Sequence, residues 1–210
     1  MTRLRVIHRT LLSMYNYSIN PLKLVVVNPR DINFVTKWHP VMPYRRNQNF
    51  NAHYCPEIDR GCFLTKNIGL IVGGDWDSKD IKVDDMPEYR SMSMHILEGV
   101  PWLETPWSRM VEKSRADMKT VEEYRRTRPA QIKKLIDSIQ TGFVACHNPL
   151  ADKYFDNVNI NIARDGTYLF EGGFHRFCIS RILELKEIRC IVNARHALAV
   201  ENKKNIRFLG

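Results

Sequence analysis

The chain of 210 residues is long enough for one compact domain with an elaborated N-terminal part. Its hydrophobic fraction of 44% and aromatic fraction of 10% are those of an ordinary globular protein and exclude a wholly disordered or fibrous chain. The net charge of +9 favours an anionic partner such as nucleic acid or a nucleotide, while a solvated basic surface without such a partner explains it equally well.

The N-terminal third predicts one strand and one long loop. Residues 1–30 contain no acidic residue, as in an organelle presequence, but we prefer a short amphipathic helix leading into a strand. The run LKLVVV, halted by Asn28-Pro29, predicts a buried strand over residues 23–27. The stretch 36–66 is rich in Pro, Asn, His and Arg and has no sustained period, so it predicts a long loop.

The segment IGLIVGGDWD predicts a second strand that ends at Gly73-Gly74. Asp75 and Asp77 follow this turn and supply the hard oxygen ligands that Mg²⁺ prefers, so they are candidate metal ligands beside a nucleotide. A merely acidic turn after a strand explains them as well. The nearby Trp76 is expected to pack on the sheet rather than to stack on a base.

Two helices are predicted over residues 87–98 and 106–127. The second helix is dense in alternating charges, which is typical of a solvated face with salt-bridging neighbours. Its basic residues could also form a stripe that binds a phosphodiester backbone. They are Arg115, Lys119, Arg125, Arg126 and Arg128.

The segment RPAQIKKLIDSIQTGF gives the clearest helical pattern, with Pro129 in the first turn and Gly142 as the C-terminal cap. Its apolar residues recur with helical spacing, so one face is expected to pack on a sheet. They are Ile132, Leu135, Ile136 and Ile139.

A β-hairpin is predicted from the alternation in NVNINI, the turn at Asp165-Gly166 and the strand that resumes over residues 167–170. A helix over about 174–185 and a short strand, EIRCIVNARH, complete the chain order. The last strand ends at the basic pair Arg195-His196.

The turn Gly172-Gly173 joins this hairpin directly to the helix, whose first turn contains Phe174, His175 and Arg176. A helix N-terminus offers unpaired N–H groups and the positive end of the helix dipole, and glycines allow an anion to approach the main chain closely. Imidazole and guanidinium groups add donors. The pattern therefore predicts a phosphate-binding turn, although a tight strand-to-helix connection needs the same glycines.

The order of these elements and the segment IARDGTYLFEGGFHRFCISRILELKEIRCIVNARH resemble the ParB/sulfiredoxin-like superfamily, clearly over 128–196 and more faintly over 22–36. The resemblance implies an α/β domain with a small mixed sheet packed with helices. Residues 1–110 would form an N-terminal elaboration that includes the first strand or strands of the fold, and residues 111–210 would form the ParB/sulfiredoxin-like core. It also implies CTP binding, ATP-dependent chemistry, phosphoryl transfer or nuclease activity at one phosphate-binding turn, so the function must be argued from the site.

The departures from the family pattern matter. Sulfiredoxins have the motif Gly-Gly-Cys-His-Arg, and this chain has Phe174 at the position of the reactive cysteine. Sulfinic acid reduction is therefore not expected. Cys178 lies one turn further on and is expected to be a structural, buried thiol. The acidic residue that often opens the ParB-type turn is Gly172 here, which leaves Glu171 as the nearest carboxylate. The candidate catalytic groups are His175 and a carboxylate base, for which Glu171, Asp75 and Asp31 are all open.

The cysteines and hydropathy indicate the compartment. The five cysteines show no Cys-x-x-Cys spacing, so neither a disulfide framework nor a zinc site is indicated and a reducing cytoplasm is expected. No apolar run approaches the ~18 residues of a membrane span, and no membrane partner is expected.

The sequence thus predicts binding of ATP or CTP, with Mg²⁺, at Gly172, Gly173, Phe174, His175 and Arg176. Arg164, Arg195 and His196 could contribute to the rim of this site. If the protein is an enzyme, phosphoryl transfer or phosphoester hydrolysis is expected. The alternatives are a DNA-binding or nuclease module without nucleotide chemistry, and a scaffold that has kept the fold and lost the chemistry.

Overall fold

The computed structural model describes residues 24–36, 70–113, 118–142 and 157–201, and all structural statements refer to these residues. They form an α/β fold with a six-stranded mixed sheet, as the sequence predicts in outline. The strands are β1 (Leu24–Val27), β2 (Phe34–Val35), β3 (Leu70–Val72), β4 (Val158–Ile162), β5 (Tyr168–Gly172) and β6 (Ile188–His196).

Helices accompany the sheet, and none of those within the described ranges is long and apolar enough to cross a bilayer. The α-helices are α4 (Pro87–Leu97), α5 (Pro106–Lys113), α6 (Met118–Thr141), α7 (Phe174–Ile182) and α8 (Ala197–Glu201). Short 3-10 turns are η1 (Pro29–Asp31), η3 (Val83–Asp85) and η4 (Trp102–Glu104).

The long strand β6 organises the sheet, whose order is β1-β6-β4-β5-β2. β6 is parallel to β4 on one side. On its other side, the first half of β6 pairs with β1 in antiparallel orientation and its last residues pair with β3 in parallel orientation. The β4–β5 hairpin turns at Asp165-Gly166, as predicted, and Gly166 supplies the positive φ of 85° that this turn requires.

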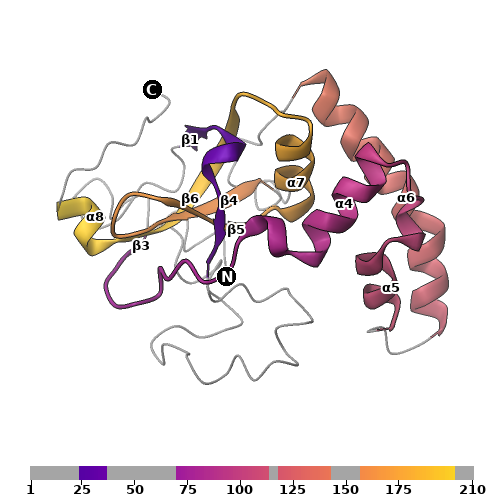
Figure 1. Ribbon diagram of the computed structural model, residues 1–210, viewed down its shortest axis with the longest axis horizontal. Coiled ribbons are helices and arrows are strands. Elements are labelled where there is room, and N and C mark those ends of the chain that lie inside the picture. The colour runs from indigo at the N-terminus through magenta and orange to yellow at the C-terminus, as the bar shows by residue number, and fades with distance from the viewer. Residues whose placement is uncertain (1–23, 37–69, 114–117, 143–156, 202–210) are drawn as a thin grey trace, which may run out of the picture.

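Helices cover one face of the sheet. Figure 1 shows α7 beside the strands, with α4, α5 and α6 farther out on the same side. The alternation of β4 directs Val158, Ile160 and Ile162 toward this layer, where they join the main hydrophobic core. On β5, Phe170 stacks on Phe177 of α7 with ring centroids 4.6 Å apart. The core therefore lies between the sheet and α7.

The predicted end of one helix at residue 127 and the predicted start of the next at Pro129 are both wrong. α6 runs from Met118 to Thr141, so Pro129 lies inside the helix rather than in its first turn. A proline removes one main-chain hydrogen bond, but the strong helix formers around it maintain the helical conformation. Gly142 ends the helix with a φ of 146°, as expected. The apolar face of α6 contacts α7 and η4 instead of lying directly on the sheet.

Hydrogen bonds from Arg181 connect α7 to the segment between β1 and β2. Its Nη1 donates to the carbonyl oxygens of Pro29 at 3.1 Å and Ile32 at 2.9 Å. Its Nη2 donates to Asn33 Oδ1 at 3.1 Å and lies 3.3 Å from Asp84 Oδ1. Only 11% of the Arg181 side chain is exposed, and Pro29 and Ile32 are buried, so their two carbonyl oxygens have limited access to water if the guanidinium is removed.

We expect Arg181→Met to lower the free energy of unfolding by about 2 to 4 kcal/mol, because it keeps the apolar stem but leaves the carbonyl oxygens of Pro29 and Ile32 without their donor. Arg181→Lys should restore little of this loss, since one ammonium cannot span acceptors arranged around a planar fork. Urea unfolding followed by circular dichroism measures both. Arg126→Met, on the exposed face of α6, is the control and should lose less than about 0.5 kcal/mol. Equal losses in Arg181→Met and the control would contradict the anchoring role.

Candidate functional site

The turn between β5 and α7 can be built only with a glycine at position 173. Gly173 has a φ of 74°, in the left-handed region that favours glycine. A Cβ added there would lie 2.4 Å from the carbonyl oxygen of Asn157 and 2.7 Å from the Cα of Val158. The amino end of α7 therefore sits directly against the start of β4.

No side chain caps the amino end of α7. Gly173 occupies the N-cap position and has no side chain to cap the helix, and the first main-chain bond of the turn runs from Phe177 N–H to the Gly173 oxygen. The N–H groups of Phe174 and His175 belong to the helical turn that has no intrahelical acceptors. Together with the helix dipole they favour an anionic oxygen at this end.

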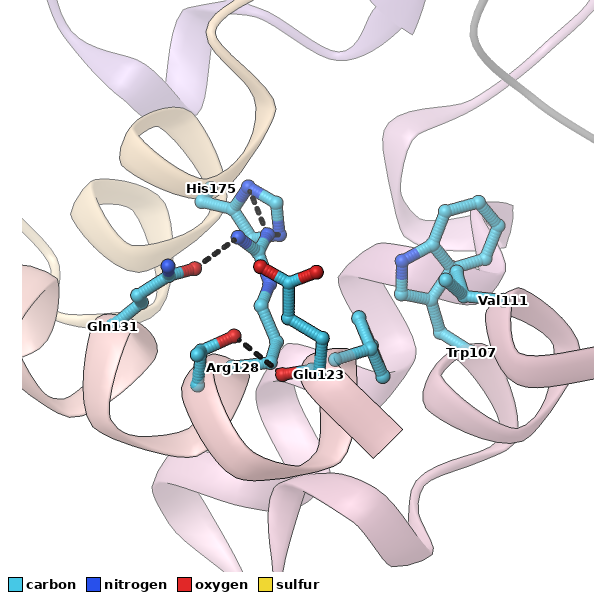
Figure 2. A pocket seen from close by; sticks show the side chains of 8 residues that line it. Trp107, Val111, Glu123, Arg128, Gln131 and His175 are labelled. Carbon is cyan, nitrogen blue, oxygen red and sulfur yellow. Dashed lines mark hydrogen bonds between the residues drawn. The ribbon is translucent and has the colours of Figure 1, made fainter. Parts of the chain in front are cut away.

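Two adjoining hollows flank the space between α7 and α6. The first, here called the α7 hollow, has a volume of about 370 Å³. It is lined by Arg128, Gln131, Ile132, Leu135, Gly173, Phe174, His175 and Arg176. The second, the α5 hollow, measures about 450 Å³ and is drawn in Figure 2. It is lined by Trp107, Val111, Glu123, Tyr124, Thr127, Arg128, Gln131 and His175.

Arg128 and His175 lie where the two hollows meet. Arg128 Nη2 is 2.6 Å from His175 Nε2, and Figure 2 shows the guanidinium directed at the imidazole. The same Arg128 nitrogen is 3.2 Å from His175 Nδ1, so both ring nitrogens face a guanidinium that can only donate. Gln131 Oε1 accepts from Arg128 Nη1 at 3.2 Å, which orients the guanidinium further.

His175 is neutral at physiological pH. Burial, and secondly the charge of Arg128, lower its pKa from 6.5 to about 3. The rings of Trp102 and Phe174 pack edge-on against the imidazole, with centroids 6.2 and 5.6 Å away. The neutral imidazole therefore does not serve as a general acid at pH 7.

Glu171 does not lie beside His175. On β5 its neighbour Phe170 faces α7, so Glu171 points to the opposite face of the sheet. Its carboxylate is fully buried there and accepts from Asn161 Nδ2 at 2.9 Å. The same amide nitrogen donates to Thr36 Oγ1, and Asn161 Oδ1 accepts from the Ala194 N–H. This polar network ties neighbouring strands together.

Asp75 and Asp77 are bound to Arg164. Arg164 Nε donates to both carboxylate oxygens of Asp77 at 3.0 Å, and Nη2 donates to Asp75 Oδ1 at 2.7 Å. Burial opposes ionisation of Asp77, but the hydrogen bonds from Arg164 outweigh it and hold the Asp77 pKa below its usual value. Within the described ranges, no group of three or more His, Cys, Asp or Glu residues is arranged to hold a metal.

The three expected rim residues do not lie at the α7 hollow. β4 begins next to Gly173, and Arg164 follows the other end of that strand. His196 Nε2 donates to the Gly74 carbonyl at 2.9 Å, and Arg164 Nη2 donates to the same oxygen at 3.0 Å. Arg195 precedes His196 and pairs with Ile162 at this same end of the sheet. The structure thus places Arg164 and His196 at the turn after β3 instead.

Cys178 matches the expectation of a structural thiol. It is fully buried on α7, and burial raises its pKa well above the usual value. Cys190 on β6 is likewise a buried free thiol. The expected helix within residues 1–23 and nearly all of the expected loop over 36–66 lie outside the described residues.

Sequence reasoning assigned Arg128 only to a basic stripe and gave Glu123 and Gln131 no role. The signal was present in the spacing of Tyr124, Arg128 and Gln131, which recur at i, i+4 and i+7 and share one face of a helix. Starting the helix at Pro129 hid that spacing, because it placed the first two residues outside the element.

Comparisons of the chain with family models, with curated proteins and with solved structures found no match. The function must therefore be inferred from the site itself.

Proposed function

We propose that the α7 hollow binds the phosphate groups of a nucleoside triphosphate, ATP or CTP, on a domain of ParB/sulfiredoxin-like architecture. The observation that supports this most is the opening of a helix N-terminus with no side-chain cap onto a hollow that is lined by two arginines from different elements. These are Arg128 of α6 and Arg176 of α7.

The donors around this hollow suit a multiply charged anion. Main-chain N–H groups of the first turn of α7 donate along the helix axis, and the two guanidinium groups that line the hollow add positive charge from the side. His175, which is neutral, adds no charge to the hollow. Two or three charge-assisted bonds correspond to an affinity on the order of micromolar to millimolar.

Catalysis, if the nucleotide is turned over, would be phosphoryl transfer or hydrolysis, in which positioning and charge neutralisation do most of the work. Arg128, Arg176 and the helix N-terminus would supply these. Glu171 is not included as a base, because its carboxylate lies on the other face of the sheet. Asp75 and Asp77 do not fit as the ligands of a Mg²⁺ ion at this hollow, since Arg164 binds both at the far end of β4.

A nucleotide panel tests the proposal. We expect ATP or CTP with Mg²⁺ to raise the melting temperature by about 5 to 10 °C at a concentration 100 times the Kd. Arg128→Ala and Arg176→Ala should each weaken binding by about 10-fold or more, measured by calorimetry, because each removes charged donors to phosphate. Arg126→Ala, an exposed arginine on the same helix that lines neither hollow, is the matched control and should bind normally.

The alternative function, DNA binding or nuclease activity by the basic side of α6, predicts a different pattern. Duplex DNA would bind with a strong salt dependence, and nucleotide would have no effect. That result, or equal nucleotide affinity of the Arg128→Ala and Arg126→Ala proteins, would overturn the nucleotide proposal. The ion pairs of Arg125 with Glu112 and of Lys133 with Asp137 already neutralise part of this side.

A further inference from the structure

The α5 hollow differs in charge from the α7 hollow that it adjoins. Both contain Arg128 and His175, but only the α5 hollow is lined by a carboxylate, that of Glu123. Figure 2 shows Glu123 rising from α6 on the same side as Arg128. Of the two adjoining hollows, the one at the first turn of α7 is therefore basic and the one toward α5 is acidic.

The α5 hollow mostly offers acceptors. Thr127 Oγ1 donates its proton to the Glu123 carbonyl at 2.7 Å, so toward a ligand its hydroxyl can only accept. The Tyr124 hydroxyl already interacts with Trp102 Nε1 at 3.2 Å and Ser108 Oγ at 3.3 Å. The Glu123 carboxylate is an acceptor with several lone pairs. A ligand group that brings its own hydrogen-bond donors fits this hollow best.

The other wall of the α5 hollow is apolar. Trp107 and Val111 of α5 face the hollow across from α6, as Figure 2 shows. The volume of about 450 Å³ lies within the usual range for small-molecule sites. An apolar wall opposite a carboxylate suits a ligand group that has an apolar face on one side and hydroxyl groups on the other.

We infer that Glu123 accepts hydrogen bonds from the ribose hydroxyl groups of the bound nucleotide, so that the protein selects ribonucleoside over deoxyribonucleoside triphosphates. This inference rests on the proposed function, because it needs the phosphates in the α7 hollow. A sugar follows the phosphates directly along a nucleotide, as the α5 hollow follows the α7 hollow past Arg128. A carboxylate that binds ribose hydroxyls is a common solution in nucleotide sites.

The charge distribution also fixes the direction of the ligand. A carboxylate repels phosphate oxygens, so the triphosphate is disfavoured in the α5 hollow and favoured beside Arg176 and the N-terminus of α7. The sugar is neutral and has hydroxyl donors, so it meets no such repulsion beside Glu123. One orientation of the nucleotide therefore suits both hollows.

Calorimetry on the full chain with ATP, 2′-deoxy-ATP, CTP and 2′-deoxy-CTP tests this inference. We expect the wild-type protein to bind the ribonucleotide of the preferred base about 10-fold or more tightly than its deoxy form. Glu123→Ala should bring the two within about 3-fold, by weakening the ribonucleotide. Glu122→Ala removes a neighbouring exposed carboxylate that lines neither hollow and should keep the wild-type ratio.

The outcomes separate the two proposals. Equal binding of ribo and deoxy forms by the wild-type protein would overturn the role of Glu123 and leave the phosphate site standing. Tighter binding of both forms by the Glu123→Ala protein would also overturn it, because Glu123 would then only repel phosphate. Failure of every triphosphate to bind the wild-type protein would overturn the proposed function and this inference together.

Discussion

Gly173→Ala is expected to lower the free energy of unfolding by about 3 to 5 kcal/mol. A left-handed backbone at alanine costs about 1 to 2 kcal/mol. The remainder comes from the new Cβ, which would lie 2.4 Å from the Asn157 oxygen, so that α7 must move away from β4. Urea unfolding followed by far-ultraviolet circular dichroism measures the loss.

Gly99→Ala is the matched control for this prediction. Gly99 has nearly the same backbone conformation, with a φ of 72° against 74° for Gly173, but a Cβ there would meet nothing within 4 Å. The control should therefore show only the backbone cost of about 1 to 2 kcal/mol. If both variants lose the same amount, the close contact of α7 with Asn157 does not contribute to stability and our account of the turn fails.

The stability of the protein should fall as the pH is lowered from about 6.5 toward 3, and His175 should cause most of the loss in the upper part of this window. The folded-state pKa of His175 is about 3, whereas the ordinary value is 6.5. Between these values the unfolded chain binds a proton that the folded chain does not. The stabilisation is thus complete above pH 6.5 and is lost as the pH falls toward the folded-state pKa.

One pKa unit corresponds to about 1.4 kcal/mol, so acidification from pH 6.5 to 4.5 should cost up to about 3 kcal/mol through His175. His175→Gln keeps an acceptor for Arg128 but does not titrate, and its stability should change much less across this range. Carboxylates with lowered pKa, such as Asp77, have an ordinary value of 3.8 and contribute at lower pH. Unfolding curves at half-unit pH intervals measure the slope, and an unchanged slope in the His175→Gln protein would contradict the assignment.

The β4–β5 hairpin and the turn into α7 could be predicted because their signals are local. The alternation of Val158, Ile160 and Ile162 and the Asp165-Gly166 turn lie within a few residues of one another. The strand β2 was missed because it has two residues, too few to show a period. The start of α6 was placed too late because Pro129 is a common first residue of helices, and here it is not one.

Only part of the candidate site could be predicted from the sequence. The turn at Gly173 and the residues that follow it are contiguous, so their geometry follows from the chain order. Arg128 reaches His175 from another helix, and no spacing rule connects residues so far apart. Glu171 was expected beside His175 because it is near in sequence, but successive residues on a strand face opposite sides of the sheet. Where a strand is followed by a helix, residues that are close in sequence can therefore lie on opposite faces of the sheet.

The arrangement of β6 also bears on how the chain acquires its fold. β6 lies near the C-terminal end of the described chain, yet it pairs with β1, β3 and β4, and Leu24 of β1 is matched with Ile191. Apart from the β4–β5 hairpin and its short partner β2, no strand pairing in the described sheet can form until β6 has been synthesised. Such long-range closure raises the contact order and slows folding. The nascent N-terminal strand therefore leaves the ribosome as an unpaired apolar edge, the kind of segment that molecular chaperones protect.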